Sequence, residues 1–248
     1  MQNRYVADIG DYVKLAILRA LAPGRRLGVV WWLFPNENHN ADGGHRDYLK
    51  QRDRWKHFDP VLFEALSNIE DEKKLDVRAI EECAVLPNAL FASEPVPCDG
   101  RPVSARPGVR RRWIEHIRTR IKDCNLVFLD PDNGIAAEGL KLTERRAGKS
   151  VAIEEIKELQ ENGRAMVVYH HQTRRKGGHH SEIRDLCARL RESGLYVSGA
   201  LRAKPWSPRV FFILNADEEL CDRAKSLADL WKSHIVWYPE VELSKKSK

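Results

Sequence analysis

The chain has 248 residues, a formal net charge of +6 and a sequence pI of about 9.1. It has no run of about 18 apolar residues, and its first residues lack the basic-then-apolar order of a secretion signal, so we expect a cytoplasmic protein without a membrane segment. Five scattered cysteines without a Cys-x-x-Cys pair argue against a disulfide framework and a thiolate zinc site, and we expect free thiols.

The length suits one α/β domain over residues 1–248, which we expect to be a monomer. Two segments stand apart by composition. Residues 95–108 hold four prolines and two glycines, which predicts a linker or flap. Residues 242–248 are rich in lysine and serine and predict a disordered tail.

The first predicted element is a helix from Tyr5 to Leu21, because apolar residues recur at helical spacing until Pro23-Gly24 ends the pattern. We interpret Asp8 and Asp11 in its first turns as capping and helix-dipole residues. An almost uniformly apolar strand from Leu27 to Phe34 follows.

A polar loop after this strand combines amides, carboxylates and imidazoles around two glycines. Three of its members are metal-ligand types, but their spacing matches no zinc or iron signature. Amide and imidazole groups both donate and accept hydrogen bonds, so we predict that the loop binds a base or a sugar, the alternative being a plain surface loop. The residues concerned are Asn36, Glu37, His39, Asn40, Asp42 and His45.

Further along, the pattern predicts an amphipathic helix over 48–69 that is interrupted at Asp59-Pro60, a helix over 71–84, a short strand over 89–92 and a helix over 110–122. The positive charges gather in groups, which is typical of proteins that bind a polyanion. We therefore expect a nucleic acid, DNA in the first place, as the partner; a solvated basic surface is the alternative. The predicted contacts are Arg110, Arg111, Arg112, Arg174, Arg175 and Lys176.

The central feature of the sequence is an apolar strand, Asn125 to Leu129, that stops on Asp130-Pro-Asp-Asn-Gly134. Open α/β sheets bind ligands beyond the carboxyl ends of such buried strands. We predict Asp130 and Asp132 as catalytic carboxylates and Asn133 as a base-reading amide. The alternative is a turn formed by residues that favour turns.

A second strand of this kind, Ala165 to His171, ends on two histidines. His170 or His171 is predicted to stabilise a departing anion, and one of the two must point into the core if the strand is covered on both faces.

The remaining pattern predicts a strand over 150–153, helices over 154–162 and 181–193, a hairpin of strands 195–201 and 210–214, and a helix reaching Ser233. Glu155 and Lys157, taken with Asp130, contain the ingredients of a nuclease metal site, but they fall at the start of a helix rather than on one strand. The alternation predicts a three-layer α/β sandwich with a central, mostly parallel sheet and an antiparallel edge hairpin.

Leu129-Asp-Pro-Asp-Asn-Gly134 with Gly139-Leu140 resembles the water-activating motif of uracil-DNA-glycosylase-like enzymes, and Tyr169 to Arg174 resembles their histidine motif. In that superfamily an acidic residue positions water and a histidine stabilises the departing base. The resemblance implies the first role for Asp130 and the second for His170 or His171.

The same Leu129-Asp-Pro-Asp-Asn stretch also resembles the strand-ending Asp-Pro-Pro-Tyr of adenine-N6 methyltransferases, and the hairpin from Leu195 to Leu214 resembles theirs. Their glycine-rich cofactor turn is absent, because Trp31-Trp32 occupies its place. We therefore expect no S-adenosylmethionine, no other cofactor and no bound metal.

The sequence as a whole predicts a DNA glycosylase that hydrolyses the bond to a flipped, modified base, as in defence against phage. The alternatives are an adenine-N6 methyltransferase-like protein, then a metal-dependent nuclease or a non-catalytic binding protein.

Overall fold

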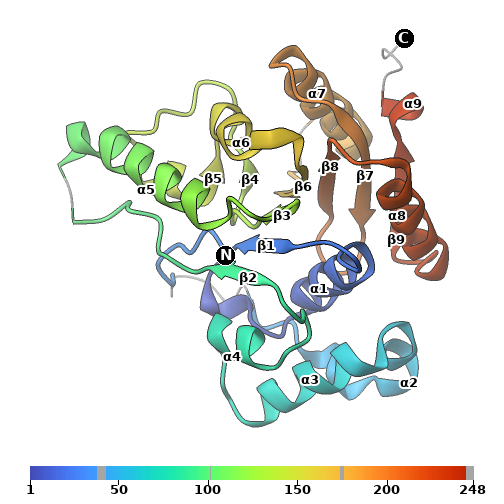
Figure 1. Cartoon of the computed structure of the whole chain (residues 1–248). Helices are drawn as coiled ribbons and strands as arrows, with labels where there is room; N and C mark the ends of the chain where they lie inside the picture. The colour runs from blue at the N-terminus through green and yellow to red at the C-terminus, as the bar shows by residue number, and fades with distance from the viewer. Residues whose placement is uncertain (38–42, 101, 174–175, 244–248) are drawn as a thin grey trace.

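The computed structural model describes residues 1–37, 43–100, 102–173 and 176–243 (Figure 1). The helices are α1 (Ile9–Leu21), α2 (Arg52–Trp55), α3 (Pro60–Asp71), α4 (Val77–Glu82), α5 (Arg106–Arg120), α6 (Ile153–Leu159), α7 (Gly178–Glu192), α8 (Glu218–Leu230) and α9 (Glu240–Leu243). The strands are β1 (Leu27–Val30), β2 (Leu90–Ala92), β3 (Leu126–Leu129), β4 (Gly134–Ile135), β5 (Ser150–Val151), β6 (Ala165–His171), β7 (Val197–Ala203), β8 (Arg209–Leu214) and β9 (Ile235–Pro239).

Seven strands form the central sheet in the order β2-β1-β3-β6-β8-β7-β9. The neighbours from β2 to β6 are parallel, and those from β6 to β9 are antiparallel, so five strands run one way and two the other. The small strands β4 and β5 form a separate parallel pair.

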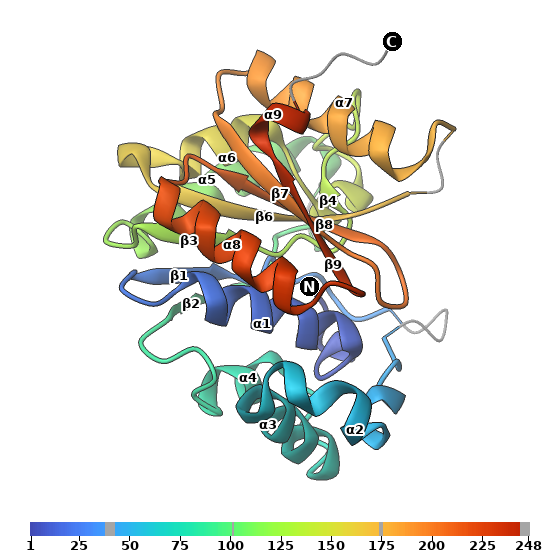
Figure 2. The same ribbon diagram turned by 90° about the vertical axis from the view of Figure 1, so that its right-hand side faces the viewer.

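Helices cover both faces of the sheet (Figures 1 and 2). One face packs against α1 and α8, with α2 to α4 outside α1, and the other packs against α5, α6 and α7. The predicted three-layer α/β architecture is therefore confirmed. Among the described ranges, no helix combines the length and apolar character needed to cross a bilayer.

The register of the parallel strands decides where the site lies. All four residues of β1 and of β3 are buried, as expected for parallel strands covered on both faces. Val30 pairs with Leu129, and Leu129 pairs with Val168, so β1 and β3 end at the same level, while β6 continues three residues further to His171. The residues that follow them consequently meet at one edge of the sheet.

Among the element boundaries that differ from the predicted ones, two have a clear local cause. The first helix begins at Ile9 rather than Tyr5, because Asp8 caps it by accepting from the Asp11 amide at 2.9 Å. The first strand ends at Val30, four residues early, and Trp32 then takes a left-handed backbone conformation (φ 50°).

The predicted carboxyl-terminal hairpin is present as β7 and β8. β8 lies between β6 and β7, and β9, which the sequence pattern did not predict, pairs with β7 as the last strand of the sheet. The hairpin is therefore not at the edge, as the sequence pattern predicted, but one strand inside it. Residues 95–108 contain the 3-10 turn Val103–Ala105 and the start of α5, and most of the predicted tail lies outside the described residues.

Candidate functional site

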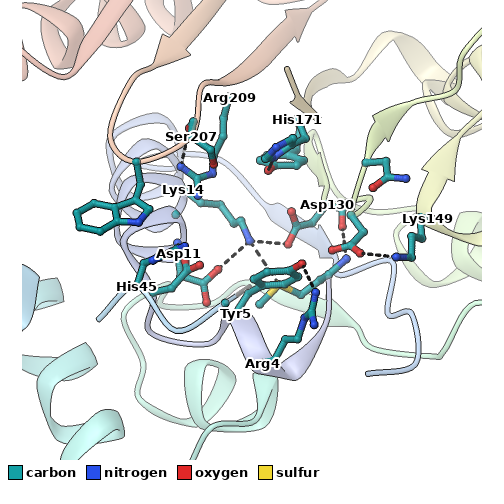
Figure 3. Close-up of a pocket in the computed structure, with 18 of the residues that line it drawn as sticks. Arg4, Tyr5, Asp11, Lys14, His45, Asp130, Lys149, His171, Ser207 and Arg209 are labelled. Carbon is teal, nitrogen blue, oxygen red and sulfur yellow. Dashed lines mark hydrogen bonds and ion pairs between the residues drawn. The ribbon is translucent and has the colours of Figure 1, made fainter. Parts of the chain in front are cut away.

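A cavity of about 310 Å³, here called the central pocket, opens where β3 and β6 end against α1 (Figure 3). Its lining comes from the amino-terminal segment, α1, the loop after β3, β6 and the β7–β8 loop. Asp130, Asp132, Asn133 and His171 of the predicted site all line it. The volume lies at the lower end of the range for small-ligand pockets.

Three buried charges form the centre of this pocket. The Lys14 ammonium lies 2.8 Å from Asp11 Oδ1 and 2.7 Å from Asp130 Oδ2 (Figure 3), and all three side chains are 6% exposed or less. Asp11 and Lys14 are three residues apart on one face of α1, while Asp130 follows β3. We call this group the Asp11–Lys14–Asp130 cluster.

The cluster is not fully satisfied. Asp11 Oδ2 is buried and has no hydrogen-bond partner among the residues that the structure describes. Burial raises the pKa of Asp11 to about 7, although the neighbouring Lys14 ammonium opposes the rise. For Lys14, burial opposes the charged form, but Asp11 and Asp130 outweigh it and raise the pKa of the ammonium. A carboxyl group of this kind can exchange a proton near neutral pH, as general acid–base catalysis requires.

A second polar group surrounds Asp132. Its Oδ2 accepts from Gln2 Nε2 at 2.6 Å and lies 3.8 Å from the Lys149 ammonium. Lys149 also pairs with Glu37. Glu37, which belongs to the predicted polar loop, therefore lies in the pocket. His45 reaches it as well, whereas Asn36 is exposed and is not part of the lining, and residues 38–42, with His39, Asn40 and Asp42, lie outside the described residues.

The crevice between β1 and β3 is filled by the chain itself. The Met1 amino nitrogen donates to Asp130 O at 2.8 Å and to Trp32 O at 3.2 Å, and the Phe34 amide donates to Met1 O. Open α/β sheets bind their ligands in this crevice, where the strand order reverses. Because Met1 occupies this crevice, the open cavity lies beside it, next to α1, β6 and β8.

The two histidines at the end of β6 have different surroundings. His170 is buried; its Nδ1 accepts from the Ile135 amide at 3.1 Å, and its Nε2 lies 3.6 Å from Glu182 Oε1. Gly134 (φ 88°) makes this approach possible, because a Cβ there would lie 2.4 Å from His170 Cα. His170 thus fixes the loop after β3, and His171 is the one that lines the central pocket.

A larger cavity of about 940 Å³, the side cavity, lies between α7 and the loop after β3 and shares Asn133 and His171 with the central pocket. Glu182 lies in it and accepts from the amide and the hydroxyl of Thr173. Burial would raise the pKa of this carboxyl group, but His170 and Thr173 outweigh burial and lower the pKa to about 2.

The predicted nucleic-acid contacts divide into buried and exposed residues. Arg110 is 4% exposed, and its guanidinium makes two bonds to Glu155, at 2.5 and 2.8 Å, and further bonds to Ala147 O and Ser150 O. It is consequently not available to a phosphate, and Glu155 is not available to a metal. Arg111, Arg112 and Lys176 are exposed, and Arg174 and Arg175 lie outside the described residues.

Several lining residues were not predicted from the sequence, and Asp11 was interpreted only as a helix-dipole residue. The available signal was three charged residues, Asp8, Asp11 and Lys14, recurring every three residues in a segment that is otherwise apolar as far as Leu18. The lining residues that the sequence pattern missed include Arg4, Tyr5, Lys14, Lys149, Tyr169, Trp206 and Arg209.

Comparisons with protein-family models, with curated proteins and with solved structures found no match. Within the described residues, no group of three or more His, Cys, Asp or Glu side chains is arranged to hold a metal ion. The chemistry of the central pocket has to be argued from its own residues.

Proposed function

We propose that the protein hydrolyses the bond between a base and its sugar, on a nucleotide turned out of DNA into the central pocket. The observation that carries this proposal is the buried Asp11 carboxyl group, which shares one pocket with Asp130 and Asp132. Its pKa is raised, and its Oδ2 has no hydrogen-bond partner in the described part of the chain. A carboxylate that orients water and an acid that protonates the leaving base are the two groups that such a hydrolysis needs.

In the proposed reaction, the oxygen of a water molecule bonds to C1′ of the sugar while the bond from C1′ to the base nitrogen breaks. The base leaves with the electron pair of that bond and takes up a proton. Asp130, whose carboxylate Lys14 holds at 2.7 Å, orients the water and accepts its proton. Asp11 supplies the proton to the base, and His171, also in the lining, is a second donor for it.

The walls of the pocket suit a planar base. Tyr5 and Tyr169 line it from two separate elements, and an enzyme that flips a base holds it between aromatic or apolar side chains. Exposed Arg111 and Arg112 on α5 supply positive charge for the DNA backbone. We infer a cytoplasmic monomer that acts on a modified base, as in a defence enzyme against phage with modified DNA.

The test incubates the protein with DNA carrying modified or unmodified bases and reveals abasic sites by alkali. Wild type should produce abasic sites, while Asp130→Asn and Asp11→Asn should lower the rate by about 100-fold or more. Asp229→Asn, an exposed carboxylate on α8, is the matched control and should retain the wild-type rate. Abasic sites on no substrate would overturn the proposal, and strand breaks without alkali would indicate a nuclease instead.

An adenine-N6 methyltransferase is the second candidate, because of one feature of the sheet. The Asp130-Pro-Asp-Asn133 stretch ends a strand next to β1, and the antiparallel β8 lies between two strands of common direction, β6 and β7. The resemblance to that family rests on the same motif and hairpin. Met1 in the crevice between β1 and β3 argues against it, since a ligand there would have to displace this residue. Calorimetric titration with S-adenosylmethionine separates the two candidates: micromolar binding would favour methyl transfer.

A further inference from the structure

One exposed aromatic residue stands at the mouth of the central pocket. Trp206 is 60% exposed, belongs to the loop between β7 and β8, and lies 5.1 Å from the His45 ring, centroid to centroid. The other large apolar side chains with high exposure do not line this pocket; they are Val61, Val103, Tyr196, Leu230 and Val241. Single exposed apolar residues are ordinary on protein surfaces, so the position of Trp206 is what needs an explanation.

The backbone of Trp206 adds a second observation. It has φ 65°, the left-handed region that glycine and asparagine adopt easily and that a bulky side chain rarely does. Such a conformation persists only where the surrounding structure enforces it, and it occurs often at functional sites. Glycine at position 206 would remove this strain, so tryptophan at this position carries a cost in stability.

The loop that carries Trp206 is held in place by hydrogen bonds from Arg209. Arg209 is 6% exposed, and its Nη1 donates to Pro205 O and to Ser207 O, both at 2.9 Å. Gly10 on α1 gives the guanidinium its space, because a Cβ at that position would lie 2.7 Å from Arg209 Nη2. These two hydrogen bonds, one to the carbonyl group on each side of Trp206, fix the direction of its backbone. The loop therefore holds the indole in a fixed position at the mouth of the pocket.

We propose that Trp206, supported by His45, is the stacking surface for the planar ring of a nucleobase entering the central pocket. That the base belongs to a nucleotide held in the central pocket rests on the proposed function, whereas the recognition of a flat heteroaromatic ring rests on the indole itself. Stacking on an aromatic side chain is the general way in which proteins hold an unpaired base, because every base has a π-face. The ligand class is thus a nucleoside or an extruded nucleotide.

Binding of the four 2′-deoxynucleosides to the intact protein tests this assignment. Trp206 is the most exposed of the seven tryptophans, and five of them are at most 8% exposed, so iodide should quench its fluorescence selectively. At least one nucleoside should protect the wild-type protein from iodide, and 2-deoxyribose alone should not. By calorimetry, Trp206→Ala should weaken nucleoside binding at least about fivefold, Trp206→Phe should weaken it less, and the control Tyr196→Ala should leave it unchanged.

A second variant separates recognition from structure. Trp206→Gly removes both the ring and the strained backbone, so its Tm should equal or exceed that of the wild type while nucleoside binding falls as in Trp206→Ala. If no nucleoside binds to the wild type, or if both variants lower Tm by several degrees while binding is unchanged, the assignment is wrong.

The outcomes for the reaction and for Trp206 are distinguishable. Nucleoside binding that depends on Trp206, without base release from any DNA, would overturn the proposed reaction and leave the stacking site in place. Base release with an unchanged KM in Trp206→Ala would uphold the reaction and overturn the stacking site.

Discussion

The protein buries opposite charges on both faces of its sheet, and the two groups differ in how completely they are satisfied. Arg110 and Glu155 form a bidentate pair whose remaining groups bond to main-chain atoms of Ala147, Ser150 and Ala152. The Asp11–Lys14–Asp130 cluster instead borders a cavity, and no group in the described ranges is a hydrogen-bond partner of Asp11 Oδ2.

The difference teaches which buried charges to associate with function. A buried pair in which every side-chain nitrogen and oxygen has a partner connects α5 to α6 and leaves little capacity for a ligand. A buried group with an unused oxygen beside a cavity keeps that capacity, at a cost in stability. Charge grouping along the sequence pointed to Arg110, and the arrangement in space points to Asp11.

Arg110→Ala is the most direct test of the difference between the Arg110–Glu155 pair and the Asp11–Lys14–Asp130 cluster. The substitution leaves the Glu155 carboxylate buried without its partner, so we expect the free energy of unfolding to fall by about 3–5 kcal/mol. Urea denaturation measures this. The neighbouring exposed residue provides the control, since Arg111→Ala should be within experimental error of wild type. A loss below about 1 kcal/mol for Arg110→Ala would mean that the pair is not the closed structural unit described here.

Lys14→Met tests the cluster in the same way and should have a smaller effect, because the adjoining cavity admits water to the abandoned carboxylates. We expect a loss of about 2–3 kcal/mol at pH 8 and a smaller loss at pH 5, where one carboxyl group can take up a proton. Lys50→Met is the matched control: Lys50 pairs with Asp47 at the same i,i+3 spacing but on the surface, and its loss should not be measurable. Equal losses at the two pH values would contradict the coupling.

Asp11→Asn tests the raised pKa by its effect on the pH dependence of stability. Because the pKa of Asp11 is about 7 in the folded state and near 3.8 when unperturbed, the folded state retains a proton that the unfolded state releases between these values. The contribution of this proton to the stability of the folded state is fully present below about pH 3.8 and is lost as the pH rises through 7. Wild type should therefore lose stability relative to Asp11→Asn between pH 5 and pH 8, and parallel profiles for the two proteins would refute the raised pKa.

The smallest change in stability is expected from Arg111→Ala combined with Arg112→Ala. This double variant tests the exposed face of α5, the helix whose buried face carries Arg110. Both side chains are exposed, so the fold should be unaffected. If each contacts one phosphate, the slope of log affinity for duplex DNA against log salt should become shallower by about 1.8. An unchanged slope would place the DNA on another surface, and Arg118→Ala, Arg120→Ala is the next pair to measure.

The sequence was sufficient for the architecture because the signals for it are local. Continuous apolar runs such as Leu126–Leu129 predict strands buried on both faces, and helical spacing with capping residues predicts the helices between them. The same runs placed Asp130 and Asp132 at the edge of the sheet, since the carboxyl ends of parallel strands meet there. β9 was missed, because a five-residue strand after a helix has no neighbouring strand in sequence to pair with.

Which charged residues form the site was decided by the tertiary structure alone. Lys14 and Asp130 are 116 residues apart in sequence, and Arg110 and Glu155 are 45 apart, so neither pairing follows from any local pattern. Burial and partner choice also determine whether a charge is neutralised, strained or free to react, and these are properties of the packed chain. The sequence therefore located the edge of the sheet where Asp130 lies, and only the folding of α1 against that edge placed Asp11 and Lys14 beside it.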